Sequence, residues 1–561
     1  MPPSIPEIEY ALQLVGPDEV ILNRAKPVHR PGRHQILCRV EAAGLCFSDL
    51  KLMKQFTGHP RKSGVVSGIA PALLKEIPSY VPGDLPAVPG HEAVVRVCAT
   101  GAGVRSYRVG ERFLVQTDYR WLRTEAANAA FGYNFEGALQ EYVLMDERVI
   151  TSPEGESMMI PASERLSASA VALIEPWACV EDAYAEKQRR SLRPEGRMLV
   201  VAETGAAEVG MRSLLARHGR PGELTWVGAR VPEALGVRAA AKRSLAEVDK
   251  ASCDDVVYFG ASADTVEQLF AKLAPHGLLN LVLCGGRLGR KVTCPVGRVH
   301  YGGIRIVGTT GFDPLESMKA IPDSGEVRPG ARVHVVGAGG PMGVMHVIRA
   351  LCAGVPGVTV FAADTDERRL EALSGLAAPL AEKHGASFKP YNPLQGAPEE
   401  EEFDYVALMA PIPALVAQAV GQAAPGAIIN IFAGIPAEVT AELDLDRYIE
   451  QQQYFVGTSG SVLEDMKAVL AKVEGGRLDS NLSVAAISGL EGAAEGLRAM
   501  ETRAVTGKII VYPWCRGLGL VKLEELGQAL PEVAEALENG VWNRRAEERL
   551  AQRFGYRPEP A

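Results

Sequence analysis

The sequence predicts an α/β protein with two tandem doubly wound domains, and an internal repeat is the main reason for this prediction. An apolar strand followed by a glycine-containing turn and a helical run occurs at residues 197–210 and again at 332–343. Three later segments also match in order: 255–259 with 404–408, 277–281 with 426–431, and 306–311 with 455–460. Matched positions lie about 135 to 150 residues apart, which is the length of a domain and too long for a solenoid repeat. Strands that are apolar throughout are typical of parallel sheets covered by helices.

The repeat sets the expected domain boundaries. We expect the doubly wound domains at about 191–325 and 326–460, after a first domain at 1–190 with short strands at 35–41 and 93–97. A helix at 463–473 and a strand ending at 508–512 follow. The last segment, 516–561, has helical spacing at 521–529, 532–538 and 544–554, with Trp542 and Phe554 as docking residues.

Composition excludes several classes of protein. The formal net charge is −9 and no long Lys/Arg tract is present, so we expect no nucleic-acid partner. The nine cysteines form no Cys-x-x-Cys pair, which argues against disulfides and fits a reducing cytoplasm. The N-terminus lacks the pattern of a signal peptide, and no apolar stretch reaches the ~18 residues of a membrane span, so we expect a cytoplasmic protein without a membrane partner.

Three short strings carry residues that suit a metal. Cys46 lies in Ala-Gly-Leu-Cys-Phe-Ser-Asp-Leu, His91 and Glu92 lie in Val-Pro-Gly-His-Glu-Ala, and Glu175 lies in Leu-Ile-Glu-Pro-Trp-Ala. Taken singly, a cysteine is more often a small buried hydrophobe and a Gly-His-Glu is more often a turn. A thiolate, an imidazole and carboxylates together suit Zn²⁺. In this order the strings resemble the zinc-dependent medium-chain dehydrogenase/reductase family, particularly its polyol and sugar dehydrogenases.

This resemblance implies a GroES-like β-barrel catalytic domain at 1–190, completed by 461–515, with two Rossmann-type domains and a short helical tail at 516–561. It also implies that Cys46, His91, Glu92 and Glu175 surround one catalytic zinc. Asp49 would fix the zinc-bound imidazole, and Ser48 would pass the substrate proton toward solvent.

The chain departs from the family pattern in two places. No cysteine lies between Cys98 and Cys179, so we expect no structural zinc. The segment between Cys46 and His91 is longer than is usual in the family, which predicts either a functional cover or a mobile insert.

The second repeat is expected to bind the cofactor. Its turn contains Gly337, Gly339, Gly340 and Gly343, and Asp364 ends the next strand about 20 residues later. A carboxylate there accepts ribose hydroxyls and repels a 2′-phosphate, which favours NAD(H) over NADP(H). The expected cofactor-binding residues are Gly337, Gly339, Gly340, Met342, Gly343, Asp364 and Arg369.

The first repeat lacks these features. Its turn offers only Gly205 and Gly210, Glu208 stands where an anion would bind, and the strand at 224–229 is followed by Arg230 rather than an acid. We therefore expect a structural role for this copy. An internal pseudo-dimer of the two copies, with one NAD(H) per chain, is the favoured arrangement, and a homo-oligomer is the alternative.

The resemblance narrows toward the L-sorbose-1-phosphate reductase-like branch. Gly-Gly-Pro-Met-Gly at 339–343, Asn-Ile-Phe-Ala-Gly at 430–434, Val-Gly-Thr-Ser-Gly at 456–460 and Tyr-Asn-Phe-Glu-Gly at 133–137 carry it. It implies hydride transfer between NAD(H) and a secondary alcohol or ketone of a sugar, polyol or sugar phosphate. The alternatives are an amino-alcohol dehydrogenase of the threonine type, a metal-free reductase of the quinone type, and a non-enzymatic NAD-binding scaffold.

Overall fold

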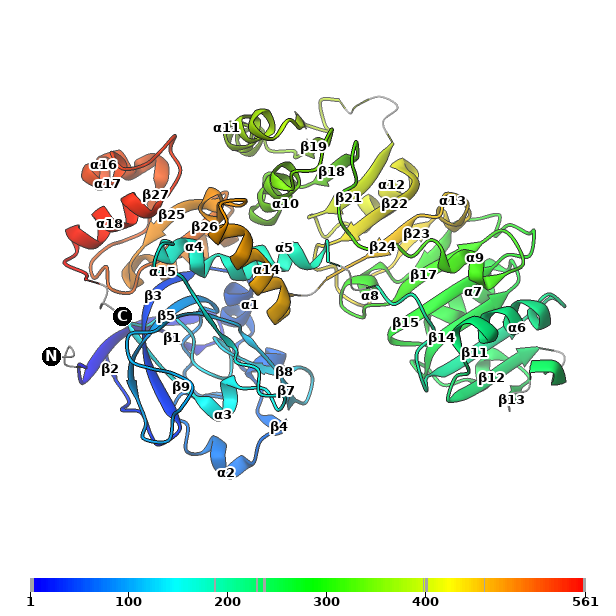
Figure 1. Ribbon diagram of the computed structural model, residues 1–561, viewed down its shortest axis with the longest axis horizontal. Coiled ribbons are helices and arrows are strands. Elements are labelled where there is room, and N and C mark those ends of the chain that lie inside the picture. The colour runs from blue at the N-terminus through cyan, green and yellow to red at the C-terminus, as the bar shows by residue number, and fades with distance from the viewer. Residues whose placement is uncertain are drawn as a thin grey trace. The chain divides into compact units, whose positions relative to one another are not determined.

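A computed structural model describes most of the chain. The described residues are 5–185, 188–228, 231–235, 239–396, 398, 402–458 and 460–557. They form two compact units, Met1–Ala178 with Ser461–Ala561, and Cys179–Gly460 (Figure 1). Within this part of the chain, no helix has both the length and the apolar character needed to cross a bilayer.

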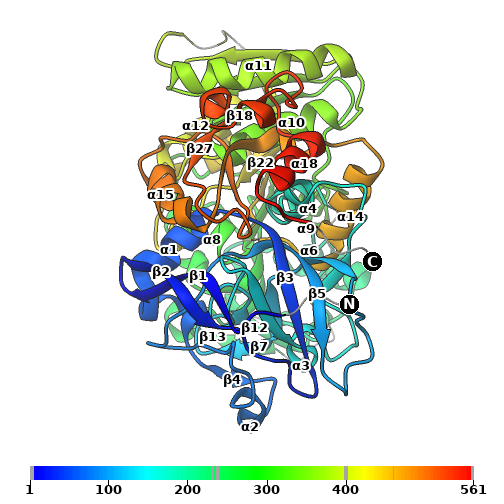
Figure 2. The same ribbon diagram turned by 90° about the vertical axis from the view of Figure 1, so that its left-hand side faces the viewer.

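The main sheet of the first unit contains eight strands from distant parts of the sequence. Its order is β10 (Met159–Pro161), β6 (Arg112–Val115), β5 (Glu92–Thr100), β3 (Gln35–Gly44), β26 (Lys508–Val511), β25 (Val484–Ser488) and β27 (Val521–Lys522), with β9 (Tyr142–Asp146) also beside β3. β3 and β5 run antiparallel next to each other (Figure 2). Because Gly44 at the end of β3 pairs with Glu92 at the start of β5, these strands deliver Cys46 and His91 to the same end of the sheet.

Smaller elements complete this unit. They include a hairpin of β1 (Ile8–Gly16) and β2 (Glu19–Pro27) and a three-stranded sheet of β4 (Val65–Ser67), β7 (Asp118–Thr124) and β8 (Asn128–Ala130). The helices are α1 (Phe47–Gln55), α2 (Pro71–Leu74), α3 (Glu147–Ile150), α4 (Ala168–Ala172), α14 (Leu463–Glu474) and α15 (Leu490–Glu501). Helix α5 (Ile174–Asp182) crosses the boundary between the two units.

The long segment between Cys46 and His91 is fixed to the rest of this unit. Its strand β4 pairs with β7, and the Val81 amide donates to the Asn134 carbonyl at 2.8 Å. The Lys62 ammonium, which is fully buried, donates to the Leu85 carbonyl at 2.8 Å and to that of Val81. These bonds favour the functional cover over the mobile insert.

The C-terminal segment forms three short helices, and residues 535–543 between the last two are not helical. It forms α16 (Leu526–Ala529), α17 (Pro531–Ala534) and α18 (Arg544–Arg553), but the helix expected from residue 521 is wrong there, because Val521 and Lys522 form β27. Val521 is β-branched and buried, and it pairs with Ile487 of β25, so the sheet determines its conformation. Trp542 is fully buried, as expected for a docking residue.

The second unit contains two six-stranded parallel sheets. The first has the order β13 (Ala239–Lys242), β12 (Glu223–Gly228), β11 (Arg197–Ala202), β14 (Cys253–Phe259), β15 (Leu273–Val282) and β17 (Arg305–Thr309). The second has the order β20 (Ser387–Tyr391), β19 (Thr359–Ala363), β18 (Arg332–Val336), β21 (Phe403–Leu408), β22 (Ala423–Ile431) and β24 (Tyr454–Val456). Both are Rossmann-like, since counted along each repeat the order is 3-2-1-4-5-6. The strands predicted from the repeat are confirmed, although Arg230 and Ser459 lie outside the described residues.

Helices accompany both sheets (Figure 1). They are α6 (Ala207–His218), α7 (Ala263–Phe270), α8 (Val296–His300) and α9 (Pro314–Met318) in the first repeat, and α10 (Pro341–Cys352), α11 (Glu367–His384), α12 (Pro413–Gln422) and α13 (Leu445–Glu450) in the second. Two short strands, β16 (Val292–Cys294) and β23 (Ala441–Leu443), join the repeats as an antiparallel pair.

The pairing of β16 with β23 is reciprocal. Thr293 lies opposite Glu442, which is its counterpart about 150 residues later in the repeat. Val292 pairs with Leu443, while its own counterpart, Ala441, pairs with Cys294. This exchange of partners is what a two-fold axis between two copies of one surface produces.

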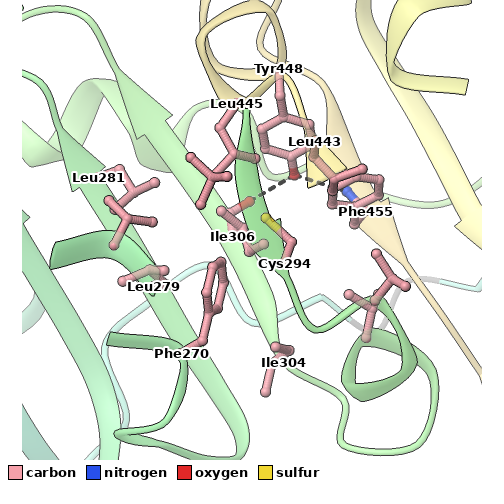
Figure 3. Close-up of a cluster of buried hydrophobic side chains, with 14 of the residues drawn as sticks. Phe270, Leu279, Leu281, Cys294, Ile304, Ile306, Leu443, Leu445, Tyr448 and Phe455 are labelled. Carbon is pink, nitrogen blue, oxygen red and sulfur yellow. Dashed lines mark hydrogen bonds between the residues drawn. The ribbon is translucent and has the colours of Figure 1, made fainter. Parts of the chain in front are cut away.

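Two glycines of the neighbouring strands repeat this reciprocity. A methyl group on Gly308 of β17 would lie 2.6 Å from Ile449, and one on Gly457, the counterpart of Gly308, would lie 2.8 Å from His300, the counterpart of Ile449. One continuous apolar cluster contains residues of both repeats (Figure 3). Its labelled members are Phe270, Leu279, Leu281, Cys294, Ile304 and Ile306 from the first repeat and Leu443, Leu445, Tyr448 and Phe455 from the second. The two sheets therefore meet through their β17 and β24 edges across a largely apolar contact.

The Tyr448 hydroxyl joins the two sheets, and its removal should destabilise the protein. It donates to the Ile306 carbonyl at 2.9 Å and accepts from the Phe455 amide at 3.1 Å (Figure 3). Tyr448→Phe leaves both groups buried without this partner, which should cost about 1–3 kcal/mol. A lower midpoint of urea unfolding, followed by fluorescence, measures the loss. Tyr301→Phe, at a side chain that is 47% exposed, serves as the control. Equal midpoints for the two variants would contradict this account.

Candidate functional site

Asp49 connects two of the sequence-predicted metal ligands. Cys46 is the N-cap of α1, and its amide donates to Asp49 Oδ2 at 2.9 Å. Asp49 Oδ1 accepts from the Gly90 amide at 3.1 Å and lies 3.0 Å from His91 Nδ1. Because a carboxylate accepts the Nδ1 proton, the other ring nitrogen of His91 is left with a lone pair for a metal.

Cys46, His91 and Glu92 form a group that fits a metal ion. One ligand atom from each lies within 4.8 Å of the others, and this is the one such group among the described residues. Glu92 Oε2 is buried and has no hydrogen-bond partner, as expected for an oxygen that a cation completes. A side chain at Gly44 would overlap Glu92, since its Cβ would lie 2.1 Å from Oε2. Sulfur, nitrogen and oxygen donors together suit zinc.

Lys508 is a residue of this site that the sequence did not reveal. Its ammonium pairs with Glu92 Oε1 and donates to the Leu45 carbonyl at 2.8 Å. Burial alone would lower the pKa of Lys508, but the Glu92 carboxylate together with its acidic neighbours Cys46 and Glu175 raises it. The only signal in the sequence is a lysine directly before the apolar run of β26, a pattern that surface lysines share.

Glu175 lies in the first turn of α5, outside the group of three ligand atoms. Its carboxyl is buried, and burial raises its pKa to about 7. His91 acts against this rise and Glu92 adds to it, so the charges of the group reach Glu175.

Aromatic and basic side chains stand next to His91. The ring of Tyr133 lies 5.6 Å from that of His91 and 5.1 Å from that of His59, measured between centroids. His59 accepts the Arg61 amide at Nδ1, and burial together with the charges of Arg61 and Lys51 lowers its pKa to about 4. His59 is thus a neutral imidazole. The sequence showed it only as part of the long segment.

The Ser48 hydroxyl also adjoins the group. Its oxygen lies 3.7 Å from Cys46 Sγ, and the residue is partly exposed. Ser48 therefore adjoins the group at a position that is open to solvent in part.

The glycines of the second repeat have distinct roles in the turn after β18. Gly337 has a φ of +82°, which L side chains rarely adopt. A methyl group on Gly339 would lie 2.5 Å from Arg369 Cβ, and one on Gly343 would lie 2.3 Å from the Gly337 carbonyl oxygen. Gly340 is the N-cap of α10 and has more room, with its nearest contact at 3.6 Å. The extra glycine is therefore Gly340.

The expected ribose acid is held against this turn. Asp364 Oδ2 accepts from the Gly339 amide at 2.9 Å, and Oδ1 accepts from the Asp366 amide at 3.0 Å. Arg369 Nε is buried without a hydrogen bond, and an oxygen of Asp366 lies 3.8 Å from it. Met342 is partly buried in the first turn of α10. The turn, the acid and the arginine thus meet at the N-terminus of α10.

The matching turn of the first repeat carries an acid that the sequence did not single out. The last residue of β11 that pairs with β14 is Ala202, and the last residue of β18 that pairs with β21 is Val336. Glu203 and Gly337 follow them and therefore occupy the same position in the two repeats. Its carboxylate accepts from the hydroxyls of Tyr258 at 2.6 Å and Thr265 at 2.8 Å. Glu208, which was expected to repel an anion, instead pairs with Arg212 at 3.0 Å on the surface. Glu203 is therefore the stronger obstacle to a phosphate at this turn.

Parts of the chain match known proteins. Residues 32–154 match the alcohol dehydrogenase GroES-like domain. An uncharacterised zinc-type alcohol dehydrogenase-like protein of Escherichia coli is 24% identical over 51% of this chain and 74% of its own length. The L-sorbose 1-phosphate reductase of Klebsiella pneumoniae is 27% identical over 39% of this chain, and the match spans 55% of the reductase, little more than half.

A solved structure shares the fold. The 2R,3R-butanediol dehydrogenase of Bacillus subtilis aligns with a TM-score of 0.52 and 15% identity, covering 90% of this chain and 99% of that one. In this chain, the family match identifies the GroES-like domain, and the strand order identifies the Rossmann-like parallel sheets. Residues 32–154 of the chain thus form an alcohol dehydrogenase GroES-like domain.

Proposed function

We propose that the protein is a zinc- and NAD-dependent dehydrogenase of a sugar, a polyol or a sugar phosphate. The group formed by Cys46, His91 and Glu92, with the orphaned Glu92 Oε2, is the observation that carries the proposal. Cys46 and His91 would hold the metal, and Glu92 and Glu175 would complete its surroundings. We propose one zinc per chain and no structural zinc.

The chain's own residues divide the chemistry between them. Zinc, when bound, supplies a Lewis acid that polarises the substrate oxygen, and NAD(H) supplies the hydride chemistry. Ser48 takes the proton of the alcohol and passes it toward solvent. Asp49 holds the His91 imidazole in one tautomer, and Lys508 restrains Glu92.

The polar surroundings of His91 favour a substrate rich in hydroxyl groups. His59, Arg61 and Lys51 influence one another electrostatically beside the group, and they offer hydrogen-bond donors that an apolar alcohol does not use. The similarity to a sugar-phosphate reductase agrees with this class. A panel of sugars, polyols, sugar phosphates and threonine-type amino alcohols, monitored by nicotinamide absorbance, tests it. Turnover confined to amino alcohols would replace the proposal by the threonine-type alternative.

Zinc content tests the metal group. The purified protein should hold about one zinc per chain, because one site with three firm ligands is proposed. Cys46→Ser should lose zinc and activity together, as serine is a poor ligand at neutral pH. Elemental analysis and the activity assay give both readouts, with Cys98→Ser, at a partly exposed cysteine, as the control. Full activity without zinc would contradict the mechanism, and two zinc ions per chain would reveal a second site.

Cofactor preference tests Asp364. Asp364→Asn keeps an oxygen that can accept from Gly339 but removes the charge, so the preference for NAD⁺ over NADP⁺ should fall by roughly tenfold or more, which corresponds to about 1.4 kcal/mol. Ratios of kcat/KM for the two cofactors measure this. Glu371→Gln, an exposed carboxylate on the helix α11 that follows Asp364, should leave the ratio unchanged. A wild-type protein that prefers NADP⁺ would show that Asp364 has been misread.

We further propose that the two repeats form an internal pseudo-dimer of one ancestral domain, in which the first copy has lost its cofactor site. Support comes from the reciprocal pairing of β16 with β23 and from Glu203 at the position of Gly337. A carboxylate at the phosphate turn repels pyrophosphate, whereas the apolar edge contact needs the sheet alone.

The stoichiometry of NADH binding tests this division of roles. Calorimetric titration should give one NADH per chain, because the first repeat offers an acid where phosphate would bind. Gly339→Ala should abolish that binding, since a side chain there overlaps Arg369. Gly205→Ala, at the open turn of the first repeat, should leave it intact. Two NADH per wild-type chain would refute the proposal.

A further inference from the structure

The C-terminal helix α18 is tied directly to the helix that precedes Glu175. Glu547 of α18 accepts the Ala168 amide at Oε1, at 2.5 Å, and the Ser169 amide at Oε2, at 2.9 Å. These are the first amides of α4, which have no partner within their own helix. A carboxylate at a helix N-terminus also interacts favourably with the helix dipole. Figure 2 shows α18 beside α4.

Other side chains of this unit fix the Glu547 carboxylate in place. The Tyr512 hydroxyl donates to Oε2 at 2.8 Å, and Trp542 Nε1 donates to the Tyr512 oxygen at 2.9 Å. Trp542 and Tyr512 are both fully buried. Burial raises the pKa of Glu547, and the amides of Ser169 and Ala168 act against this rise. Burying the Glu547 carboxylate is thus unfavourable for its charged form, and its hydrogen bonds to the first amides of α4 offset part of this cost.

A second set of hydrogen bonds, made by Ser480, holds α4 and the start of α5. Ser480 Oγ donates to the Ala170 carbonyl at 2.8 Å, and Trp177 Nε1 donates to the Ser480 carbonyl at 3.2 Å. Only Leu173 separates α4 from α5. Glu175 follows in the first turn of α5, so the position of its backbone depends on how α4 is held.

We propose that Glu547 is a positioning residue, through which the C-terminal segment places the Glu175 carboxyl beside Cys46, His91 and Glu92. The inference rests on the proposed zinc site. It assigns the segment a role in metal binding that is separate from the stability of the fold. Loosening the N-terminus of α4 should displace Glu175 and weaken zinc binding by about tenfold, the range for residues that orient metal ligands through another group.

The full-length holoprotein provides the first test. Glu547→Ala should accelerate hydrogen exchange in the peptide covering 168–177 and lower zinc affinity, measured by competition with a chelator, by about tenfold. Glu547→Gln should lie between Glu547→Ala and the wild type, because its amide oxygen accepts only one of the two N–H groups. Glu548→Gln, on the exposed side of the same helix, should match the wild type. If Glu547→Ala does not fold, Glu547→Gln carries the comparison.

A double-mutant cycle separates positioning from general stability. In a Glu175→Ala background, Glu547→Ala should cause no further loss of zinc affinity, because its effect passes through Glu175. An equal loss in both backgrounds, or faster exchange with unchanged zinc affinity, would overturn the proposal. A wild-type protein without zinc would instead overturn the proposed function, and the inference with it. The zinc content of the wild type therefore tests the proposed function, and the comparison of zinc affinities between variants tests the inference alone.

Discussion

The buried Asp49 carboxylate is the constraint on which the metal group depends. It accepts the Cys46 amide that begins α1 and the Gly90 amide that precedes His91, and it contacts the His91 ring. Burial, the largest single influence, would raise its pKa, but His91 and the Cys46 and Gly90 amides together lower it. Each buried amide left without a partner would cost about 1–3 kcal/mol. One side chain therefore fixes both the entry to α1 and the tautomer of the imidazole.

The same site requires the two ends of the sequence to meet. Strand β26 lies beside β3, which brings the Lys508 ammonium to Glu92 and to the Leu45 carbonyl. Glu547 then reaches α4 from still further along the chain. Such contacts are made only after the whole of the second unit has been traversed, and loop closure of that length is entropically costly. The completed site thus depends on contacts between residues far apart in the sequence, whereas Cys46 and His91 are brought together by the pairing of β3 with β5.

Features that depend on residues close together in the sequence could be predicted, whereas contacts between residues far apart in the sequence could not. Periodicity and glycine turns predicted the strands of both repeats, because buried parallel strands are apolar whatever their neighbours are. The association of Cys46, His91 and Glu92 was expected from their local strings, and the structure brings them together. The pairing of Lys508 with Glu92 could not be predicted, since it depends on which strand lies next to β3. For the same reason Val521 looked helical until its pairing with Ile487 was known.

The two repeats separate the demands of packing from those of ligand binding. Gly210 and Gly343 occupy the helix after the turn, and a methyl group on either would lie within 2.7 Å of a neighbouring residue of its own repeat. The two glycines are not counterparts, since the register that matches Glu203 with Gly337 places Gly210 opposite Val344. Gly210 lets its helix approach Phe259 of β14, whereas Gly343 lets its helix approach the turn. Gly337, by contrast, is replaced by Glu203 in the first repeat, where the carboxylate finds hydroxyl partners instead of a phosphate. The turn glycine proposed to serve a dinucleotide is thus present only in the second repeat, which also carries the proposed ribose acid Asp364.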